Sequence, residues 1–107
     1  MDWKVQDNSA EHQYEIVSED TERAGVVGGF IAYSRSDGVI TVQHTQVEQA
    51  YRDEGLGSVL ARGALDDARE RRLWVIPECP FVRRYIARHR EYVDLVPPEV
   101  QGEYGLS

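Results

Sequence analysis

The feature that most constrains this fold is a glycine loop between a strand pattern and a helix pattern. Val39–Val47 has strand composition, and Gly55–Arg71 carries small and apolar residues at helical spacing. The loop reads Tyr51-Arg52-Asp53-Glu54-Gly55-Leu56-Gly57-Ser58. The first N–H groups of a helix are unpaired, and glycines let an anion reach them without a Cβ in the way. The loop is therefore a candidate phosphate site, although short Gly-x-Gly runs more often only turn the chain.

Length and composition limit the classes of protein to consider. A chain of 107 residues is long enough for one domain with one hydrophobic core. It contains no apolar run near the roughly 20 residues that cross a bilayer, and no signal-peptide pattern opens it. Its single cysteine, Cys79, cannot form an internal disulfide. We therefore expect a cytoplasmic protein with no membrane partner.

The charge favours a basic substrate. A formal net charge of −7 argues against nucleic acid as a partner, because binding phosphates requires a concentrated positive field. Two groups of arginines stand out against this background. The group at residues 69–72 is explained by the dipole at the end of the predicted helix. The group near Cys79 could meet the phosphates of a cofactor that contains a nucleotide, and it consists of Arg83, Arg84, Arg88 and Arg90.

Strand patterns precede helix patterns along the chain. The strand patterns cover Gln13–Val17, Ala24–Tyr33, Val39–Val47 and Leu73–Ile76, and the helix patterns cover Gly55–Arg71 and Pro80–His89. Both sides of Ala24–Tyr33 are apolar or small, which predicts a strand covered on both faces. Ser18–Glu22 and Ser36–Gly38 have the composition of turns. We expect one domain over residues 1–107, with its core at 13–96 and a mobile tail at 99–107.

The order of these elements resembles the core of the GCN5-related N-acetyltransferases. The segments that carry the resemblance are His44-Thr45-Gln46-Val47, Arg52-Asp53-Glu54-Gly55-Leu56-Gly57, Pro77-Glu78-Cys79-Pro80-Phe81-Val82, Tyr85-Ile86 and His89-Arg90-Glu91-Tyr92. The chain is most similar to a minimal subgroup, about as long as this chain, with a cysteine before the last helix. The resemblance covers residues 13–96 and implies an α/β (α+β) fold with a mixed, mostly antiparallel sheet and two principal helices.

The same resemblance implies a cofactor, a partner and a set of site residues. Acetyl-coenzyme A would donate the acetyl group, and the acceptor would be an amine of a small molecule, a peptide or a protein. The main chain at Gln46 and Val47 would bind the pantetheine arm and the thioester carbonyl. Tyr85 would be the general acid for the departing sulfur. The pyrophosphate would be bound by the loop residues Arg52, Gly55, Leu56, Gly57 and Ser58.

Each candidate catalytic residue also has a purely structural interpretation. Tyr85 lies on an aromatic stripe at helical spacing that could simply face the core. Cys79, at the predicted N-cap, could contact the coenzyme, carry the acetyl group as a nucleophile, or pack as a small buried residue. His44 could be a general base acting through water. It shares a predicted face with Ile40, Val42 and Gln46, which favours a buried core histidine.

Gln46 and the lack of a substrate hairpin keep other functions open. Gln46 stands where the subgroup commonly has glutamate, so a carboxylate role at that position is in doubt. No segment supplies the helical hairpin that forms much of the amine site in larger relatives, which predicts a shallow, open site. Direct attack of the amine on the thioester is the expected mechanism. The alternatives are coenzyme binding without efficient transfer, and a Cys79-dependent acyl carrier or thioesterase. Histidine and cysteine spacing predicts no metal.

Overall fold

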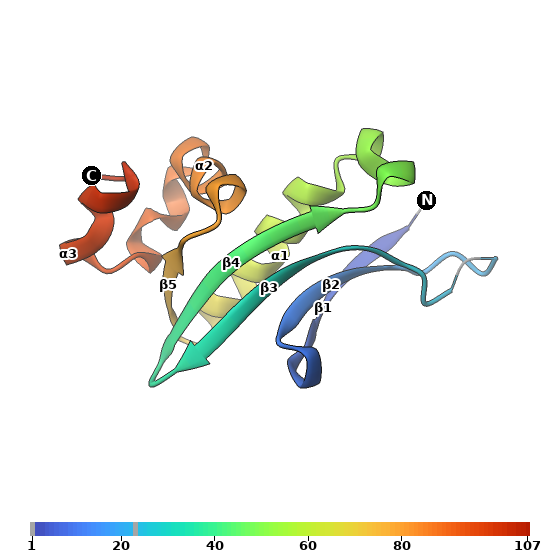
Figure 1. Ribbon diagram of the computed structural model, residues 1–107, viewed down its shortest axis with the longest axis horizontal. Coiled ribbons are helices and arrows are strands. Elements are labelled where there is room, and N and C mark those ends of the chain that lie inside the picture. The colour runs from blue at the N-terminus through green and yellow to red at the C-terminus, as the bar shows by residue number, and fades with distance from the viewer. Residues whose placement is uncertain (1, 23) are drawn as a thin grey trace.

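A five-stranded sheet forms the frame of the molecule (Figure 1). In the computed structural model, which describes residues 2–22 and 24–107, the strands lie in chain order. Met1 and Arg23, both inside the expected domain, lie outside the described residues. The strands are β1 (Trp3–Asn8), β2 (Gln13–Ser18), β3 (Val27–Ser36), β4 (Val39–Val47) and β5 (Trp74–Pro77). Only the pairing of β4 with β5 is parallel, so the expected mixed, mostly antiparallel sheet is confirmed.

Two principal helices pack on this sheet. The helix α1 (Leu56–Glu70) contacts all five strands, and Figure 1 draws it behind β3 and β4. The helix α2 (Pro80–Arg88) contacts β4, β5 and α1. The remaining helical segments are short: η1 (Ser9–Glu11), η2 (Gln49–Glu54), η3 (Arg90–Leu95), α3 (Pro98–Gln101) and η4 (Gly102–Tyr104). No helix in the described residues is both long and apolar enough to cross a membrane.

The core lies between α1 and one face of the sheet. Leu60 and Leu65 of α1 are completely or almost completely buried, as are Ile16 and Ile31 of the facing strands. Gly63 permits this close approach, because a Cβ there would lie 2.7 Å from the Cβ of Val5. The small and apolar residues at helical spacing on this helix therefore let it lie close on the sheet.

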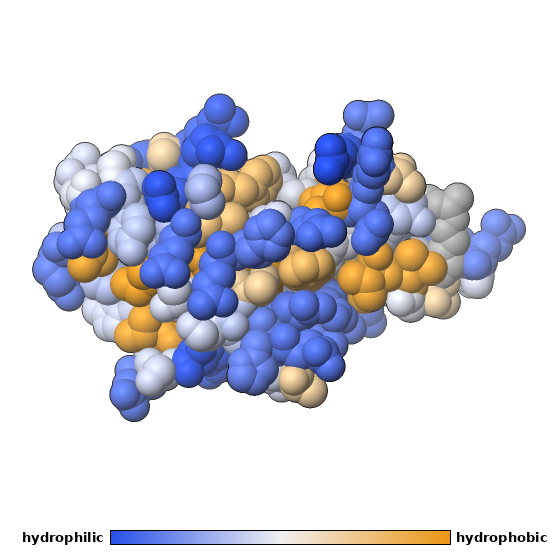
Figure 2. Space-filling model, viewed as in Figure 1, coloured by the Kyte–Doolittle hydropathy of each residue, from blue (hydrophilic) through white to orange (hydrophobic). Residues whose placement is uncertain are grey.

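The other face of β3 is not closed, so the prediction that this strand is covered on both faces is wrong. Ile31 and Tyr33 point to the α1 side and are buried, whereas Phe30 and Ala32 are half-buried. Figure 2 views this second face and shows hydrophobic patches among hydrophilic residues. We call it the open face of the sheet. Apolar composition on both sides of the strand did not require a second covering layer.

Both ends of the chain are more ordered than the sequence indicated. β1 was not expected, yet it pairs with β2 from Trp3 to Asn8. The tail at 99–107 was expected to be mobile, and this prediction is wrong. The tail forms α3 and η4, and Leu106 is completely buried. Arg90 Nη2 donates a hydrogen bond to the Leu106 carbonyl at 3.1 Å.

Candidate active site

A bulge in β4 decides which side chains face the site. Ala32 pairs with His44, but the next residue, Tyr33, pairs with Val42, so Gln43 is an extra residue in β4. The bulge reverses the alternation of side chains beyond it. Val42 is buried on the α1 side, whereas His44 is exposed. The expectation that His44 is a buried core histidine is therefore wrong.

The end of β4 loses its partner strand on the β5 side. The parallel pairing runs from Val39 with Trp74 to Val42 with Pro77. The Cys79 N–H then donates to the Val42 carbonyl at 2.9 Å, and the chain turns away into α2. β4 continues to Val47, which leaves its backbone edge at residues 43–47 beyond the reach of β5. Such an edge can hydrogen-bond an extended chain that contains amides.

The molecular surface is indented where this edge is left open. Figure 2 shows a notch in the upper outline, between the projections that correspond to α2 and η2 in Figure 1. The predicted pantetheine contacts, Gln46 and Val47, lie at the end of β4 that leads to η2. Gln46 is exposed and Val47 is half-buried.

The glycine loop ends in a helix N-terminus without a side-chain cap. Gly55 adopts a left-handed conformation with φ 71°, and it is the N-cap of α1. Because no side chain caps α1, its first N–H groups remain available to an anion. The side chain of Leu56 is buried in the core, so only its backbone N–H could serve a ligand.

Gly57 is required for packing, which sequence analysis did not anticipate. A Cβ at this position would lie 2.8 Å from Cζ of Phe81, so the glycine lets the start of α1 lie against the start of α2. An aromatic ring therefore fills the side of Gly57 where a Cβ would stand, so a phosphate cannot approach from that side. The Gly57 N–H remains part of the first turn of α1.

Trp3 of β1 contacts the glycine loop through Tyr51 and Glu54. The rings of Trp3 and Tyr51 meet edge to face with centroids 5.1 Å apart. Trp3 Nε1 donates to Glu54 Oε1 at 3.3 Å, which holds that carboxylate toward β1. Arg52 is exposed on η2 and forms no ion pair within the described part of the chain. It can therefore turn toward an anion at the loop.

Two adjoining hollows lie between α1 and α2. Their volumes are about 90 Å³ and about 250 Å³, and Ser58, Tyr85 and His89 line both. Arg62 lines one of them, and Arg84 and Arg88 line the other. These hollows continue from the first turn of α1, because Ser58 belongs to that turn and Arg62 follows four residues later. We call them the α1–α2 hollow.

The arginines that line this hollow differ in their contacts from Arg83 and Arg90, the other two arginines of the predicted group. Arg62, Arg84 and Arg88 are exposed and have no carboxylate partner among the described residues. Arg83 instead donates to the backbone carbonyls of Pro77 and Glu78. The arginine group predicted from the sequence thus separates into two pairs: Arg84 and Arg88 face the hollow, whereas Arg83 and Arg90 hold the backbone.

Tyr85 is distinguished from the other buried tyrosines by its hydroxyl group. The hydroxyls of Tyr14, Tyr33 and Tyr92 each donate to an aspartate. No hydrogen bond within the described residues holds the hydroxyl of Tyr85, although only 9% of the residue is exposed. Burial raises the pKa of Tyr85, and this outweighs the opposing effect of nearby Arg62. Tyr85 therefore holds its proton at neutral pH and can donate it to a ligand.

The ring of Tyr85 is held firmly in place. It stacks on the ring of His89 with centroids 4.0 Å apart and an interplanar angle of 16°. His89 is itself positioned by a 2.9 Å contact from Nδ1 to the Tyr85 carbonyl. The aromatic stripe predicted from helical spacing is therefore real, but it lines a hollow at the surface and does not fill the centre of the core.

Cys79 is the N-cap residue of α2, as predicted. Its thiol is buried, with 3% of the residue exposed, and its Sγ lies 3.2 Å from Thr45 Oγ1 of β4. The sulfur makes no capping hydrogen bond to the helix. The pair of Thr45 and Cys79 therefore bridges β4 and α2 at the point where β4 and β5 separate.

The predicted site residues fall into three groups. Arg52, Gly55, Leu56, Gly57 and Ser58 lie at the start of α1, and Ser58 shares the α1–α2 hollow with Tyr85. Cys79 meets Thr45 at the open edge of β4. His44 and Gln46 lie on the open face, where the His44 ring is 6.2 Å from Phe30. Within the described residues, no group of three or more histidine, cysteine or acidic side chains could hold a metal ion.

Several residues of this region were not predictable from the motifs alone. The contact of Thr45 with Cys79 depends on the bulge, which the sequence pattern does not indicate. Arg62 and His89 were not assigned to the cofactor site. Arg62 follows Ser58 by four residues, and His89 follows Tyr85 by four residues. This spacing is the signal that could have placed each pair on a common helix face.

Comparison with known proteins identifies the family. A family model described as GCN5-related N-acetyl-transferase matches residues 10–95. A solution structure of a GCN5-like protein from Staphylococcus aureus has a similar fold, with a TM-score of 0.62. The two sequences are 24% identical, and the match covers 88% of this chain and 87% of the other. A search of curated proteins found no match. Because the family model spans most of the chain, the protein belongs to the GCN5-related N-acetyltransferase family.

Proposed function

We propose that this protein binds acetyl-coenzyme A and transfers the acetyl group directly to an amine. The observation that carries the proposal is the α1–α2 hollow. Three arginines without carboxylate partners in the described chain surround it, although the chain has a net charge of −7. The hollow also adjoins the uncapped N-terminus of α1. Clustered cations and free N–H groups are the elements of a phosphate site.

The coenzyme would extend from this hollow along the open edge of β4. The N–H groups at the start of α1, together with Arg52, would bind the pyrophosphate. The exposed guanidinium groups of Arg62, Arg84 and Arg88 could extend outward from the hollow to the remaining phosphate of the coenzyme, because guanidinium groups bind phosphates well. The buried Tyr85 hydroxyl would then be left for the sulfur. The backbone at Gln46 and Val47 would hydrogen-bond the amides of the pantetheine arm. The coenzyme supplies the thioester, and the protein supplies the orientation.

Transfer requires that the amine nitrogen bond to the thioester carbon while the carbon–sulfur bond breaks. The nitrogen loses a proton and the departing sulfur gains one. Tyr85 is the proposed proton donor, because it is protonated at neutral pH and no hydrogen bond within the described residues holds its hydroxyl. His44 is the proposed acceptor, through water, since its ring is exposed on the open face. Gln46 can orient the amine but cannot take its proton.

Direct attack is favoured over a covalent route through Cys79. The thiol is almost completely buried and lies against Thr45, so a reacting thioester would contact it only where β4 and α2 separate. We propose that Cys79 lines the thioester end of the site without bonding to the acetyl group. A stable acetyl-enzyme would instead favour an acyl carrier or a thioesterase.

Two measurements test the function. Thermal unfolding should show stabilisation by coenzyme A and acetyl-coenzyme A, but not by ATP. Ligand at a hundred times its dissociation constant adds roughly 2.7 kcal/mol to the free energy of unfolding. Thiol release should then depend on an added amine. Stabilisation without amine-dependent thiol release would favour a coenzyme-binding protein, and no stabilisation would refute the proposal.

Paired variants test the location of the phosphates. Arg84→Gln combined with Arg88→Gln should weaken coenzyme A binding by about tenfold or more, because a hydrogen bond to a charged group contributes roughly 1.5–3 kcal/mol. Arg72→Gln is the matched control, since Arg72 is exposed at the far end of α1. Equal affinities for coenzyme A in the control and in the double variant would place the phosphates elsewhere.

A further inference from the structure

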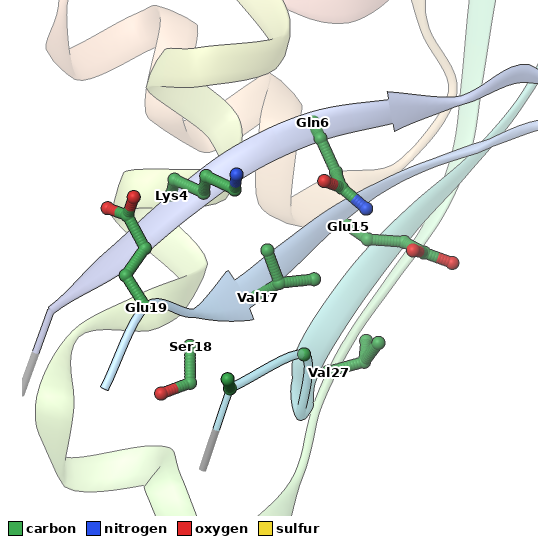
Figure 3. Close-up of a pocket in the computed structure, with 9 residues that line it drawn as sticks. Lys4, Gln6, Glu15, Val17, Ser18, Glu19 and Val27 are labelled. Carbon is green, nitrogen blue, oxygen red and sulfur yellow. The ribbon is translucent and has the colours of Figure 1, made fainter. Parts of the chain in front are cut away.

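A depression on the open face of the sheet lies outside the proposed coenzyme site. Its volume is about 410 Å³, and residues from β1, β2, β3 and the turn between β2 and β3 line it. Figure 3 shows that its side chains include Lys4, Gln6, Glu15, Val17, Glu19 and Val27. Glu15 is the unusual member, because only 8% of this charged residue is exposed. Glutamate is rarely buried to that extent unless it has a partner.

The partners of Glu15 in the structure are neutral. Asn8 Nδ2 and Gln13 Nε2 donate to its carboxylate at 3.0 Å and 2.7 Å, and both bonds end on Oε2. No cationic side chain within the described residues forms an ion pair with it. Lys4 lines the same depression, but in Figure 3 the Glu15 carboxylate points away from Lys4 and Glu19. A buried carboxylate with only neutral donors is well suited to a cationic ligand.

The strand register connects Glu15 to the proposed acetyl-transfer site. Glu15 is opposite Phe30, and Phe30 is opposite Gln46, so the three form one row across β2, β3 and β4. Neighbouring strands are about 4.8 Å apart, which places Glu15 about 10 Å from Gln46. The row lies on the open face, which also carries His44. An acceptor that reacts beside Gln46 can therefore reach Glu15 across Phe30.

The distribution of charge favours the same kind of ligand. Residues 1–54 contain 11 acidic and four basic side chains, whereas residues 55–107 contain eight of each. The formal charge of −7 therefore belongs to the part of the chain that forms β1 to β4 and η2. A positive ligand is attracted to this part of the molecule, while the arginines of the α1–α2 hollow remain available to the phosphates.

We propose that the acceptor is an amine with a second positive charge about 10 Å from its reacting nitrogen, and that Glu15 binds this second charge. The proposal rests on the acetyltransferase function proposed above. Glu15 determines specificity and takes no part in the chemical step. Phe30, half-buried between the two ends of the row, provides an apolar surface for the methylene chain that joins the two charges.

Two amines of equal chain length test this directly. Heptamethylenediamine has two charges about 10 Å apart when extended, and heptylamine has one. We expect wild-type kcat/KM to be about tenfold to a hundredfold higher for the diamine than for heptylamine. One hydrogen bond to a charged group typically changes an equilibrium or a rate by about this factor. Glu15→Gln should abolish this preference. Glu19→Gln is the control, because Glu19 lines the same depression but is exposed, and it should retain the preference.

A binding measurement separates this proposal from the proposed function. Calorimetry of the protein with coenzyme A, which carries no acetyl group, should show that the diamine binds more tightly than heptylamine. Binding that depends on Glu15 without any acetyl transfer would support the cation site and refute the enzyme. Transfer with equal kcat/KM for both amines in the wild type would refute the cation site and support the enzyme. Because that comparison uses the wild type alone, it holds even if Glu15→Gln does not fold.

Discussion

At the scale of single residues, the state of one hydroxyl group separates Tyr85 from its neighbours. The other three buried tyrosines donate to aspartates, so their hydroxyls already have structural partners. Tyr85 has a fixed ring, and none of the hydrogen bonds in the described part of the chain holds its hydroxyl. This combination fits a general acid better than a packing residue, because a residue that only fills space needs no unpaired polar group.

The variant Tyr85→Phe tests this assignment. It retains the stacked ring and removes only the oxygen, so the melting temperature and the affinity for coenzyme A should change little. General acid catalysis contributes about a hundredfold to ten-thousandfold, and we expect kcat to fall by about a hundredfold, because a thiolate leaves partly without assistance. Steady-state thiol release measures the effect. An unchanged kcat, with chemistry shown to limit turnover, would leave Tyr85 with a structural role.

Cys79 makes a second prediction at this scale. If its thiol only lines the site, Cys79→Ala should lower turnover modestly and should not abolish it. Intact-mass measurement of the wild type with acetyl-coenzyme A, in the absence of amine, should show no acetyl adduct. A stoichiometric adduct at Cys79, lost in the alanine variant together with all activity, would instead establish the covalent route.

At the scale of elements, the contact between the starts of α1 and α2 fixes the shape of the site. Gly57 and Phe81 meet there, and the α1–α2 hollow lies beside them. We expect Gly57→Ala to destabilise the fold by about 1–3 kcal/mol, since its Cβ would overlap the Phe81 ring. Phe81→Leu should recover part of this loss by making room. Chemical denaturation of both single variants and the double variant measures the coupling. Additive free energies would mean that the two residues do not meet.

The elements themselves were largely predictable, because they depend on local patterns. The bounds expected for β4 agree with the structure, and those for α1 and α2 differ by one residue at most. The orientation of His44 was not predictable, since the bulge that exposes it arises from pairing between strands. The packing role of Gly57 was also hidden, because Phe81 lies 24 residues later in the sequence and meets it only after folding.

At the scale of the whole molecule, the two termini complete the fold that supports the site. β1 contributes Trp3, which contacts Tyr51 and Glu54 of the phosphate loop. The C-terminal segment packs beside α2, where Arg83 lies over the Tyr104 ring at 5.2 Å. Neither end carries a strong sequence pattern, and each depends on contacts with distant residues. The sequence patterns therefore predict a core within 13–96, whereas the structure extends it in both directions.

Leu106 gives the sharpest test of this larger core. It is completely buried although it is the second-last residue, and its N–H donates to the Gln101 carbonyl at 2.9 Å. Leu106→Ala should lower the free energy of unfolding by about 2–5 kcal/mol, as expected when a buried leucine is truncated. Ser107, the exposed neighbour of Leu106, provides a matched control. Ser107→Ala should change the free energy of unfolding by less than about 0.5 kcal/mol. Urea denaturation measures both. Equal stabilities for the two variants would mean that the tail is mobile, as its composition alone suggests.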